Sequence, residues 1–152
     1  MDRYRADIAF MQQAMLQAEE ARGLGEVPVG AVVVLDDTVI GRGCNRPITN
    51  HDPSAHAEIV AIRRASEQLK NYRLTGASLY VTLEPCIMCA GAILHARIDR
   101  LIFAARDQKY GAAGSKLNLL ESEFLNHGTG VTAGVLEQES EDLLKTFFES
   151  RR

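Results

Sequence analysis

The sequence predicts an α/β protein, a three-layer α/β/α sandwich with a central mixed five-stranded sheet. From residue 77 onward an apolar strand, a helix and a second apolar strand follow one another, an order that favours right-handed crossovers and parallel pairing. Two β-branched runs around a short turn at residues 31–41 indicate an antiparallel hairpin. A chain of 152 residues, 46% of them hydrophobic, can build one core, so we expect a single domain over residues 1–152.

The N-terminal third of the chain is expected to form a helix and then this hairpin. Residues 5–21 carry apolar side chains three and four positions apart, which is the pattern of one helical stripe: Ile8, Met11, Met15 and Ala18. The hairpin pairs "AVVVL" at 31–35 with "TVIG" at 38–41, and Asp36 and Asp37 lie at its turn.

A second helix is expected after the loop that begins near residue 45. Asp52 is a suitable N-cap, and Pro53 suits the first helical position because proline lacks the N–H that would go unpaired there. The inward stripe of this helix would be Ile59, Ile62 and Leu69.

The remaining elements are predicted from hydrophobic periodicity. Residues 77–83 alternate as a strand does, with Leu79, Val81 and Leu83 against Ser78, Tyr80 and Thr82. A helix at 85–96 and a strand at 100–105 follow. Beyond them we expect a loop at 111–115, a short helical piece at 117–120, a fifth strand at 131–136 and an amphipathic helix at 140–152 that carries Leu143, Leu144, Phe147 and Phe148.

Charge and cysteine content limit the functional classes. The formal net charge is −3 and the pI about 5.8, so any nucleic-acid contact must be local. Three cysteines fit a secreted disulfide framework poorly, and no signal-peptide pattern or long apolar run is present, which predicts a cytoplasmic protein without membrane contact. The local basic groups are Arg63 with Arg64, Lys70 with Arg73, Arg106 with Lys109 and Lys116, and Arg151 with Arg152.

The segment "EPCIMCAGA" at 84–92 carries the strongest chemical signal. Cys86 and Cys89 are three residues apart at the expected start of a helix, a spacing that places both side chains on one face. The unpaired N–H groups and the positive end of the helix dipole stabilise thiolates there. Two thiolates at this spacing suit a zinc ion, which needs at least one further protein ligand.

The upstream segment "DPSAHAEIV" offers that ligand. His56 lies near a second expected helix start, and Glu58 follows two residues later. Residues two apart on a helix point to different sides, so we assign His56 as the third ligand and Glu58 as a free carboxylate beside the ion. Such a site leaves one coordination position for water, and Glu58 can serve as general base and general acid.

Two other interpretations of the cysteine pair remain open. A C-x-x-C pair in a reducing compartment can be a thioredoxin-like redox motif. A closed structural zinc site would need a fourth ligand, for which Cys44, His51, His95 and His127 are the available residues. Cys44 by itself is expected to be a small buried hydrophobe, and the three histidines are expected at the surface or at helix ends.

The combination of "HAE" at 56–58 with "EPCIMCAGA" resembles the zinc-dependent nucleobase deaminases, whose fold is cytidine deaminase-like. Within that superfamily the chain resembles the tRNA-specific adenosine deaminases, because "EVPVGAVVV", "GRGCNRPI", "HDPSAHAEI", "NYRL" and "ARDQKYGAAGS" occur in the same order. The likeness spans nearly all of the chain. Ala104, where members often have glycine, departs from the pattern without touching a proposed ligand.

The resemblance implies hydrolytic conversion of adenosine to inosine at the wobble position of a tRNA, commonly an arginine tRNA. One zinc ion per subunit would activate a water molecule for attack on C6 of adenine, and Glu58 would transfer protons as ammonia leaves. By position, Asn45 would hydrogen-bond the adenine, the N–H of Ala57 would contact the C6 substituent, and Val29 would form a wall beside the base.

The implied partner is a tRNA anticodon loop, because a base must leave its stack to reach such a site. We expect the segment after residue 105 and the C-terminal tail to face the RNA. The family also forms homodimers. The expected RNA contacts are Arg106, Asp107, Lys109, Arg151 and Arg152.

Two alternative functions are compatible with the same motifs. One is deamination of a free nucleoside, nucleotide or base, such as cytidine, deoxycytidylate or guanine, with the same zinc chemistry. The other is a non-catalytic binding module in which the zinc ion is structural.

Overall fold

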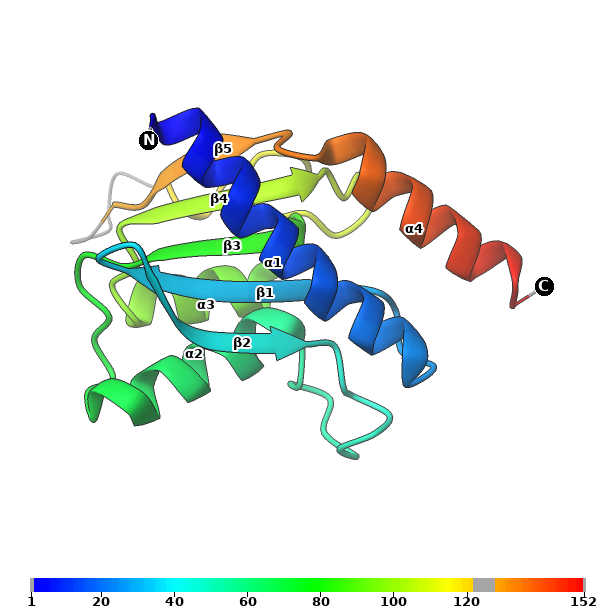
Figure 1. The fold of residues 1–152 in the computed structure, drawn as a ribbon, viewed down its shortest axis with the longest axis horizontal. Helices are drawn as coiled ribbons and strands as arrows, with labels where there is room; N and C mark the ends of the chain where they lie inside the picture. The colour runs from blue at the N-terminus through cyan, green and yellow to red at the C-terminus, as the bar shows by residue number, and fades with distance from the viewer. Residues whose placement is uncertain (1, 122–127, 152) are drawn as a thin grey trace.

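The computed structural model describes residues 2–121 and 128–151 (Figure 1). Helices and strands alternate over most of this length, as the sequence predicts. In chain order the elements are α1 (Arg3–Gly23), β1 (Gly30–Leu35), β2 (Thr38–Cys44), α2 (Ala57–Leu69), β3 (Ser78–Leu83), α3 (Ile87–His95), β4 (Arg100–Ala105), β5 (Gly130–Ala133) and α4 (Glu137–Glu149).

The strands form one five-stranded mixed sheet in the order β2-β1-β3-β4-β5, which confirms the predicted fold class. β1 pairs antiparallel with both β2 and β3, whereas β3 with β4 and β4 with β5 are parallel. The predicted hairpin is present, and Asp36 and Asp37 at its turn both have positive φ angles, of 50° and 59°. A two-residue turn of this kind matches the right-handed twist of the flanking strands.

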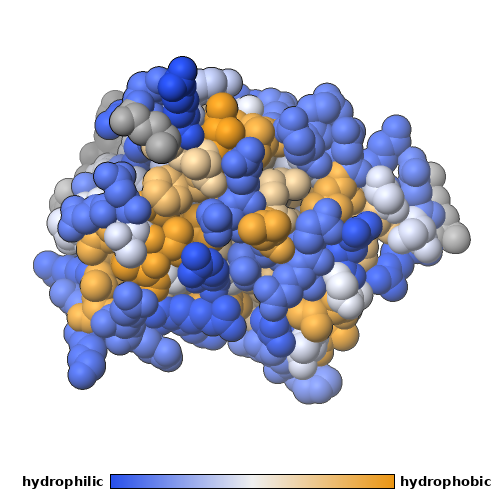
Figure 2. All heavy atoms as spheres, in the orientation of Figure 1, coloured by the Kyte–Doolittle hydropathy of each residue, from blue (hydrophilic) through white to orange (hydrophobic). Residues whose placement is uncertain are grey.

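Helices cover both faces of the sheet. α1 crosses one face, and α2 and α3 lie behind the opposite face (Figure 1). The face that carries α1 presents hydrophobic residues interrupted by hydrophilic ones (Figure 2). Because helices cover both faces, Tyr80 and Thr82 on one side of β3 are buried, as are Leu79 and Val81 on the other side. Within the described residues, no helix combines the length and the hydrophobicity that a membrane span requires.

The predicted start of α2 is wrong by several residues. The helix begins at Ala57 with His56 as its N-cap, rather than at Pro53 after Asp52. The carboxylate of Asp52 instead accepts hydrogen bonds from the N–H and the hydroxyl of Ser54, which closes a local turn before the helix. At the other end Leu69 is 37% exposed, so it does not belong to the predicted inward stripe.

Several predicted elements near the C-terminus are also corrected. Residues 117–120 form no helical piece, because Asn118 makes an isolated bridge to Ala113. β5 ends at Ala133 rather than at residue 136, since Gly134 turns the chain with a φ of 90°. α4 consequently begins at Glu137, three residues before the expected position. It extends past the ends of the strands, to the right in Figure 1.

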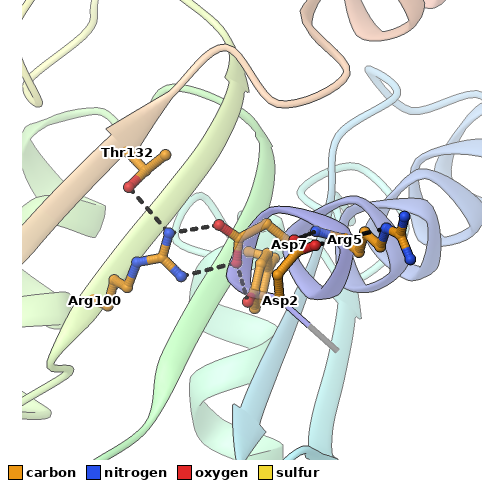
Figure 3. A network of polar contacts seen from close by, with 6 residues as sticks. Asp2, Arg5, Asp7, Arg100 and Thr132 are labelled. Carbon is orange, nitrogen blue, oxygen red and sulfur yellow. Dashed lines mark hydrogen bonds and ion pairs between the residues drawn. The ribbon is translucent and has the colours of Figure 1, made fainter.

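A buried polar network fastens α1 to the sheet. Asp7 of α1 accepts two hydrogen bonds from the guanidinium of Arg100 in β4, at 2.8 and 2.5 Å, and one from the hydroxyl of Tyr80 at 2.7 Å. Arg100 also donates to Thr132 of β5 at 3.1 Å, as Figure 3 shows. Burial alone would raise the pKa of Asp7, but the hydrogen bonds from Arg100 and Tyr80 outweigh it and lower that pKa.

Candidate metal centre and active-site pocket

Three potential metal ligands converge where α2 and α3 begin. His56 is the N-cap of α2, Cys86 is the N-cap of α3, and Cys89 lies in the first turn of α3. Sγ of Cys86 and Sγ of Cys89 each lie 3.6 Å from Nδ1 of His56, and the three ligand atoms lie within 4.8 Å of one another. The predicted convergence of these residues is therefore present, although Cys86 precedes the helix instead of lying inside it.

The donor set fits a zinc ion. Zinc–sulfur and zinc–nitrogen bonds of about 2.3 and 2.0 Å at tetrahedral angles place nitrogen and sulfur roughly 3.5 Å apart. Both observed sulfur–nitrogen separations, 3.6 Å, are consistent with that value. Among the described residues the cluster comprises these three ligands alone, and neither Cys44 nor the exposed His51 and His95 belongs to it. His127 lies outside the described residues.

Close packing of α2 on the edge of the sheet brings His56 into place. A Cβ atom at Gly43 of β2 would lie 2.5 Å from the carbonyl oxygen of Ala57 and 2.5 Å from the N atom of Ala61. Only glycine allows this approach, so the first turn of α2 rests directly on the strand. β1 separates β2 from β3 in the sheet. The chain leads from the C-terminal end of β3 into Cys86.

Of the three groups, electrostatics favour the metal-ligating form of Cys86 and the protonated forms of Cys89 and His56. The hydrogen bond with Cys89, assisted by that with His56, lowers the pKa of Cys86 to about 3, so this side chain is a thiolate. The hydrogen bond with Cys86, together with burial, raises the pKa of Cys89. The hydrogen bond to Cys86 also raises the pKa of His56. A bound cation would take the place of the protons on Cys89 and His56, because a metal ion binds thiolate and neutral imidazole.

Glu58 is a buried carboxyl group that lies next to the cluster without joining it. Its residue is 4% exposed, it lines the pocket beside His56, and its oxygens are not among the three ligand atoms. Burial raises the pKa of Glu58 to about 7, although its own backbone N–H and the charge of His56 act in the opposite direction. A carboxyl group with a raised pKa in a pocket is typical of a proton-transfer residue.

The cluster opens into a cavity of about 920 Å³. Val29 and Asn45, which the family resemblance predicts beside the base, both line this cavity. The backbone N–H of Ala57 donates to Oδ1 of Asn45 at 3.0 Å, and the N–H of Asn45 donates to the carbonyl of Val29 at 3.0 Å. The three residues predicted to contact the base are thus joined to one another. The apolar part of the lining includes Val27, Leu83, Ile87, Leu117, Leu144 and Phe148.

Two buried acids that sequence reasoning missed fix the chain segments around the cavity. Glu26 accepts hydrogen bonds from the N–H groups of Ile48 and Thr49, at 3.3 and 2.7 Å, in the segment that follows Asn45. Glu84 binds the segment after β4 in the same way. The signal available in the sequence was an acidic residue in an apolar stretch, directly after the strand that ends at Leu83 for Glu84 and four residues before the strand that begins at Gly30 for Glu26.

The expected RNA-contact residues divide into two groups. Arg106, Asp107 and Lys109 line the cavity. Arg151 instead lies over the ring of Phe147, 4.6 Å from its centroid, and donates to the carbonyl of Gly25 at 3.3 Å. Arg152 lies outside the described residues.

Comparison with known proteins defines the class to which this fold and site belong. A family model described as MafB19-like deaminase matches residues 6–152, which is nearly the whole chain. Two tRNA-specific adenosine deaminases are close relatives. That of Haemophilus influenzae is 51% identical over 96% of this chain and 85% of its own length, and that of Bacillus subtilis is 44% identical over 96% and 91%. The chain belongs to the tRNA-specific adenosine deaminase family.

Solved structures agree with this assignment. A structure from a study of A-to-I editing by tRNA:A34 deaminases superimposes with a TM-score of 0.86 at 47% identity, covering 89% of this chain and 98% of its own. A guanine deaminase from Nitrosomonas europaea is more distant, with a TM-score of 0.77 and 25% identity over 92% of this chain and 83% of its own. The fold is therefore shared among deaminases of different substrates, and the higher identity lies with the tRNA enzymes.

Proposed function

We propose that this protein hydrolytically deaminates adenosine to inosine at the wobble position of a tRNA, with an arginine tRNA as the expected substrate. The observation that carries the proposal is the buried carboxyl group of Glu58 beside the cluster of His56, Cys86 and Cys89, in the wall of a cavity. The relatives above, which carry the name of this activity, support the choice of adenosine in tRNA.

His56, Cys86 and Cys89 would hold one zinc ion per subunit. When bound, the ion supplies a Lewis acid that lowers the pKa of a coordinated water molecule and so provides the nucleophile for C6 of adenine. Glu58 would transfer two protons in turn: it accepts one from the water molecule and delivers it to N1 of the ring, and then accepts one from the hydroxyl group added at C6 and delivers it to the departing amine. The carboxyl group of Glu58 is not one of the three ligand groups, so it can serve in this role.

Asn45, Val29 and Ala57 would hold the base. The amide of Asn45 lies in the cavity wall, where it can hydrogen-bond the edge of adenine, and the side chain of Val29 packs beside the ring. The N–H of Ala57 already binds Asn45, so Asn45 orients the helix start at which the C6 substituent would lie.

The substrate strand must be single-stranded, because the reacting atom of a stacked base cannot reach a ligand cluster inside a cavity. An anticodon loop meets this need. Arg106, Asp107 and Lys109 at the cavity would contact the strand beside the base, and Arg151 with Arg152 would contact the RNA farther away. We expect a homodimer that acts in the cytoplasm, where three free cysteines remain reduced.

A direct assay tests the proposal. Zinc-loaded protein is incubated with an RNA hairpin that carries adenosine at the wobble position, and inosine is measured by mass spectrometry of the digested RNA. Free adenosine, cytidine, deoxycytidylate and guanine are tested in parallel. We expect inosine in the hairpin. Turnover of a free compound without turnover of the hairpin would instead support the free-nucleoside or base deaminase, and no turnover at all would support a binding module.

A further inference from the structure

Glu84 is a buried carboxylate that binds a distant chain segment through several donors at once. The residue is 2% exposed and lies two positions before the ligand Cys86. Its oxygens accept hydrogen bonds from the N–H groups of Asp107, Ala113 and Ser115, at 3.1, 3.1 and 3.0 Å, and from the hydroxyl of Ser115. One side chain thus satisfies three backbone donors of a segment that has little regular structure of its own.

The backbone at Gly111 packs directly against the carboxylate of Glu84. A Cβ atom at Gly111 would lie 2.4 Å from both Cδ and Oε2 of Glu84, so only glycine permits the segment to approach the carboxylate. Backbone hydrogen bonds flank the contact: the N–H of Glu84 donates to Ala105, and that of Ala112 donates to Pro85, both at 2.8 Å. The ligand-bearing segment and the later segment are therefore held together as one unit.

The segment bound by Glu84, residues 106–117, forms one wall of the cavity, and we call it the wall segment. Its residues at the cavity include the exposed cations Arg106, Lys109 and Lys116 and the exposed ring of Tyr110. In a chain of net charge −3 this is a local concentration of positive charge beside the ligand cluster. Its position relative to Cys86 depends on the Glu84 contacts.

We propose that Glu84 is a positioning residue whose buried carboxylate fixes the wall segment against the metal-ligand cluster, and thereby sets where the substrate RNA strand lies relative to the reacting base. The inference rests on the proposed function for the identity of the strand. Glu84 also lines the cavity, but both of its carboxylate oxygens are bound to the wall segment, so it acts through the backbone of that segment.

Limited proteolysis tests the structural half of the proposal without any substrate. In Glu84→Gln an amide group replaces one acceptor and faces backbone N–H donors, so the wall segment should open. Trypsin should then cut after Arg106, Lys109 or Lys116 at least about tenfold faster than in the wild type, because cleavage follows the population of the open form. Cleavage sites are identified by mass spectrometry.

Asp7→Asn is the matched control for this experiment. Asp7 is an equally buried carboxylate, 3% exposed, in a network away from the cavity, so its replacement lowers global stability without touching the wall segment. Asp7→Asn should be cleaved within residues 106–117 at the wild-type rate. The comparison is made at temperatures where the wild type, Glu84→Gln and Asp7→Asn are all folded. Equal acceleration in both variants, or no acceleration in Glu84→Gln, would overturn the proposal.

Steady-state kinetics on the wobble-adenosine hairpin test the functional half. We expect Glu84→Gln to raise KM by about tenfold while kcat changes by less than about threefold and zinc content is unchanged, since the contact positions the strand and not the reacting groups. Gly111→Ala should reproduce the KM effect, and Ser115→Ala, which removes one donor, should show a smaller rise even if Glu84→Gln fails to fold. An unchanged KM in all three variants would refute the positioning role.

If the wild type does not deaminate the hairpin, the proposed function fails, whereas proteolysis still decides whether Glu84 holds the wall segment.

Discussion

The backbone N–H of Ala57 donates a 3.0 Å hydrogen bond to Oδ1 of Asn45, a residue twelve positions earlier in the chain. The N-cap residue of α2, His56, makes no capping bond with its own side chain, so Asn45 supplies this cap from the preceding loop. Because Asn45 also lines the cavity, its side chain joins the start of the helix that carries Glu58 to the wall where the base would lie.

Replacing Asn45 should therefore affect both stability and activity. Asn45→Ala removes the acceptor for Ala57, and we expect a loss of about 1 kcal/mol in the free energy of unfolding, the typical effect of a lost helix cap. Deamination of the hairpin should fall by at least about tenfold in kcat/KM, the loss expected when a hydrogen bond to the base disappears. Urea unfolding and steady-state kinetics measure the two effects.

Asn45→Asp separates these two roles. Aspartate keeps the oxygen that accepts from Ala57 and is a good capping residue, so stability should return to the wild-type value. It lacks the NH₂ group that would donate to adenine, so activity should stay low. Full activity of the aspartate variant would show that Asn45 acts only on the helix.

The ion pair between Asp7 and Arg100 predicts a large stability effect far from the cavity. Asp7→Ala leaves the guanidinium of Arg100 partly buried without its partner, which typically costs about 3 to 5 kcal/mol in unfolding free energy. Zinc content and KM for the hairpin should not change at temperatures where the protein is folded. Chemical denaturation of both proteins, with parallel kinetics, measures this, and a loss below about 1 kcal/mol would contradict the structural role.

The ion pair between Asp7 and Arg100 should also make the free energy of unfolding fall at low pH. The pKa of Asp7 is lower in the folded protein than its ordinary value, so the unfolded chain binds the proton more readily. The stabilisation is therefore complete above the unfolded pKa of about 3.9 and is lost as the pH falls toward the folded value. Below about pH 4 the unfolding free energy of the wild type should converge on that of Asp7→Asn, and parallel curves for the two proteins would contradict this assignment.

The cysteines should differ sharply in their effect on metal content. Cys86→Ser removes a thiolate ligand, and we expect zinc binding and deamination to be lost, with some loss of stability. Cys44→Ala is the matched control, because Cys44 is buried but lies outside the cluster. It should retain about one zinc ion per chain by atomic spectrometry. Zinc retention in Cys86→Ser would remove this residue from the ligand set.

The charges of the wall segment should be visible in the salt dependence of RNA binding. If Lys109 contacts a phosphate, Lys109→Ala should reduce the slope of log K against log salt by about 0.7, the value for one contact to a single strand. Arg63→Ala is the control, because Arg63 is exposed and pairs with Asp52. Fluorescence anisotropy with a labelled hairpin measures both slopes. Equal slopes for Lys109→Ala and the wild type would exclude such a contact.

Local signals in the sequence were sufficient for most of the fold. The strand at 100–105 is found at the predicted residues, and Asp36 and Asp37 form the predicted turn, because short apolar runs and turn residues are determined by neighbouring positions. The start of α2 was predicted wrongly because Asp52 can cap a helix or close a turn with Ser54, and only tertiary packing on Gly43 decides between these.

The candidate site was predictable where the chemistry of a residue is distinctive. His56, Cys86 and Cys89 carry ligand atoms in a recognisable spacing, and the structure brings them together. The position of Glu84 after an apolar strand indicates a buried acid, but its partners could not be predicted, because they are N–H groups at positions 107–115 and backbone donors leave no mark in a sequence. The partnership of Asp7 with Arg100, 93 residues apart, is equally invisible before the sheet is assembled.

The central claim is that three side chains hold the metal ion while Glu58 transfers protons without binding it. Glu58→Gln tests this claim most directly, because glutamine keeps the size of the side chain and loses only the ability to exchange a proton. Metal content and hairpin deamination are measured on the same preparation. We expect about one zinc ion per chain and a fall in kcat of at least about 10². Wild-type turnover, or loss of the metal from the variant, would contradict the account.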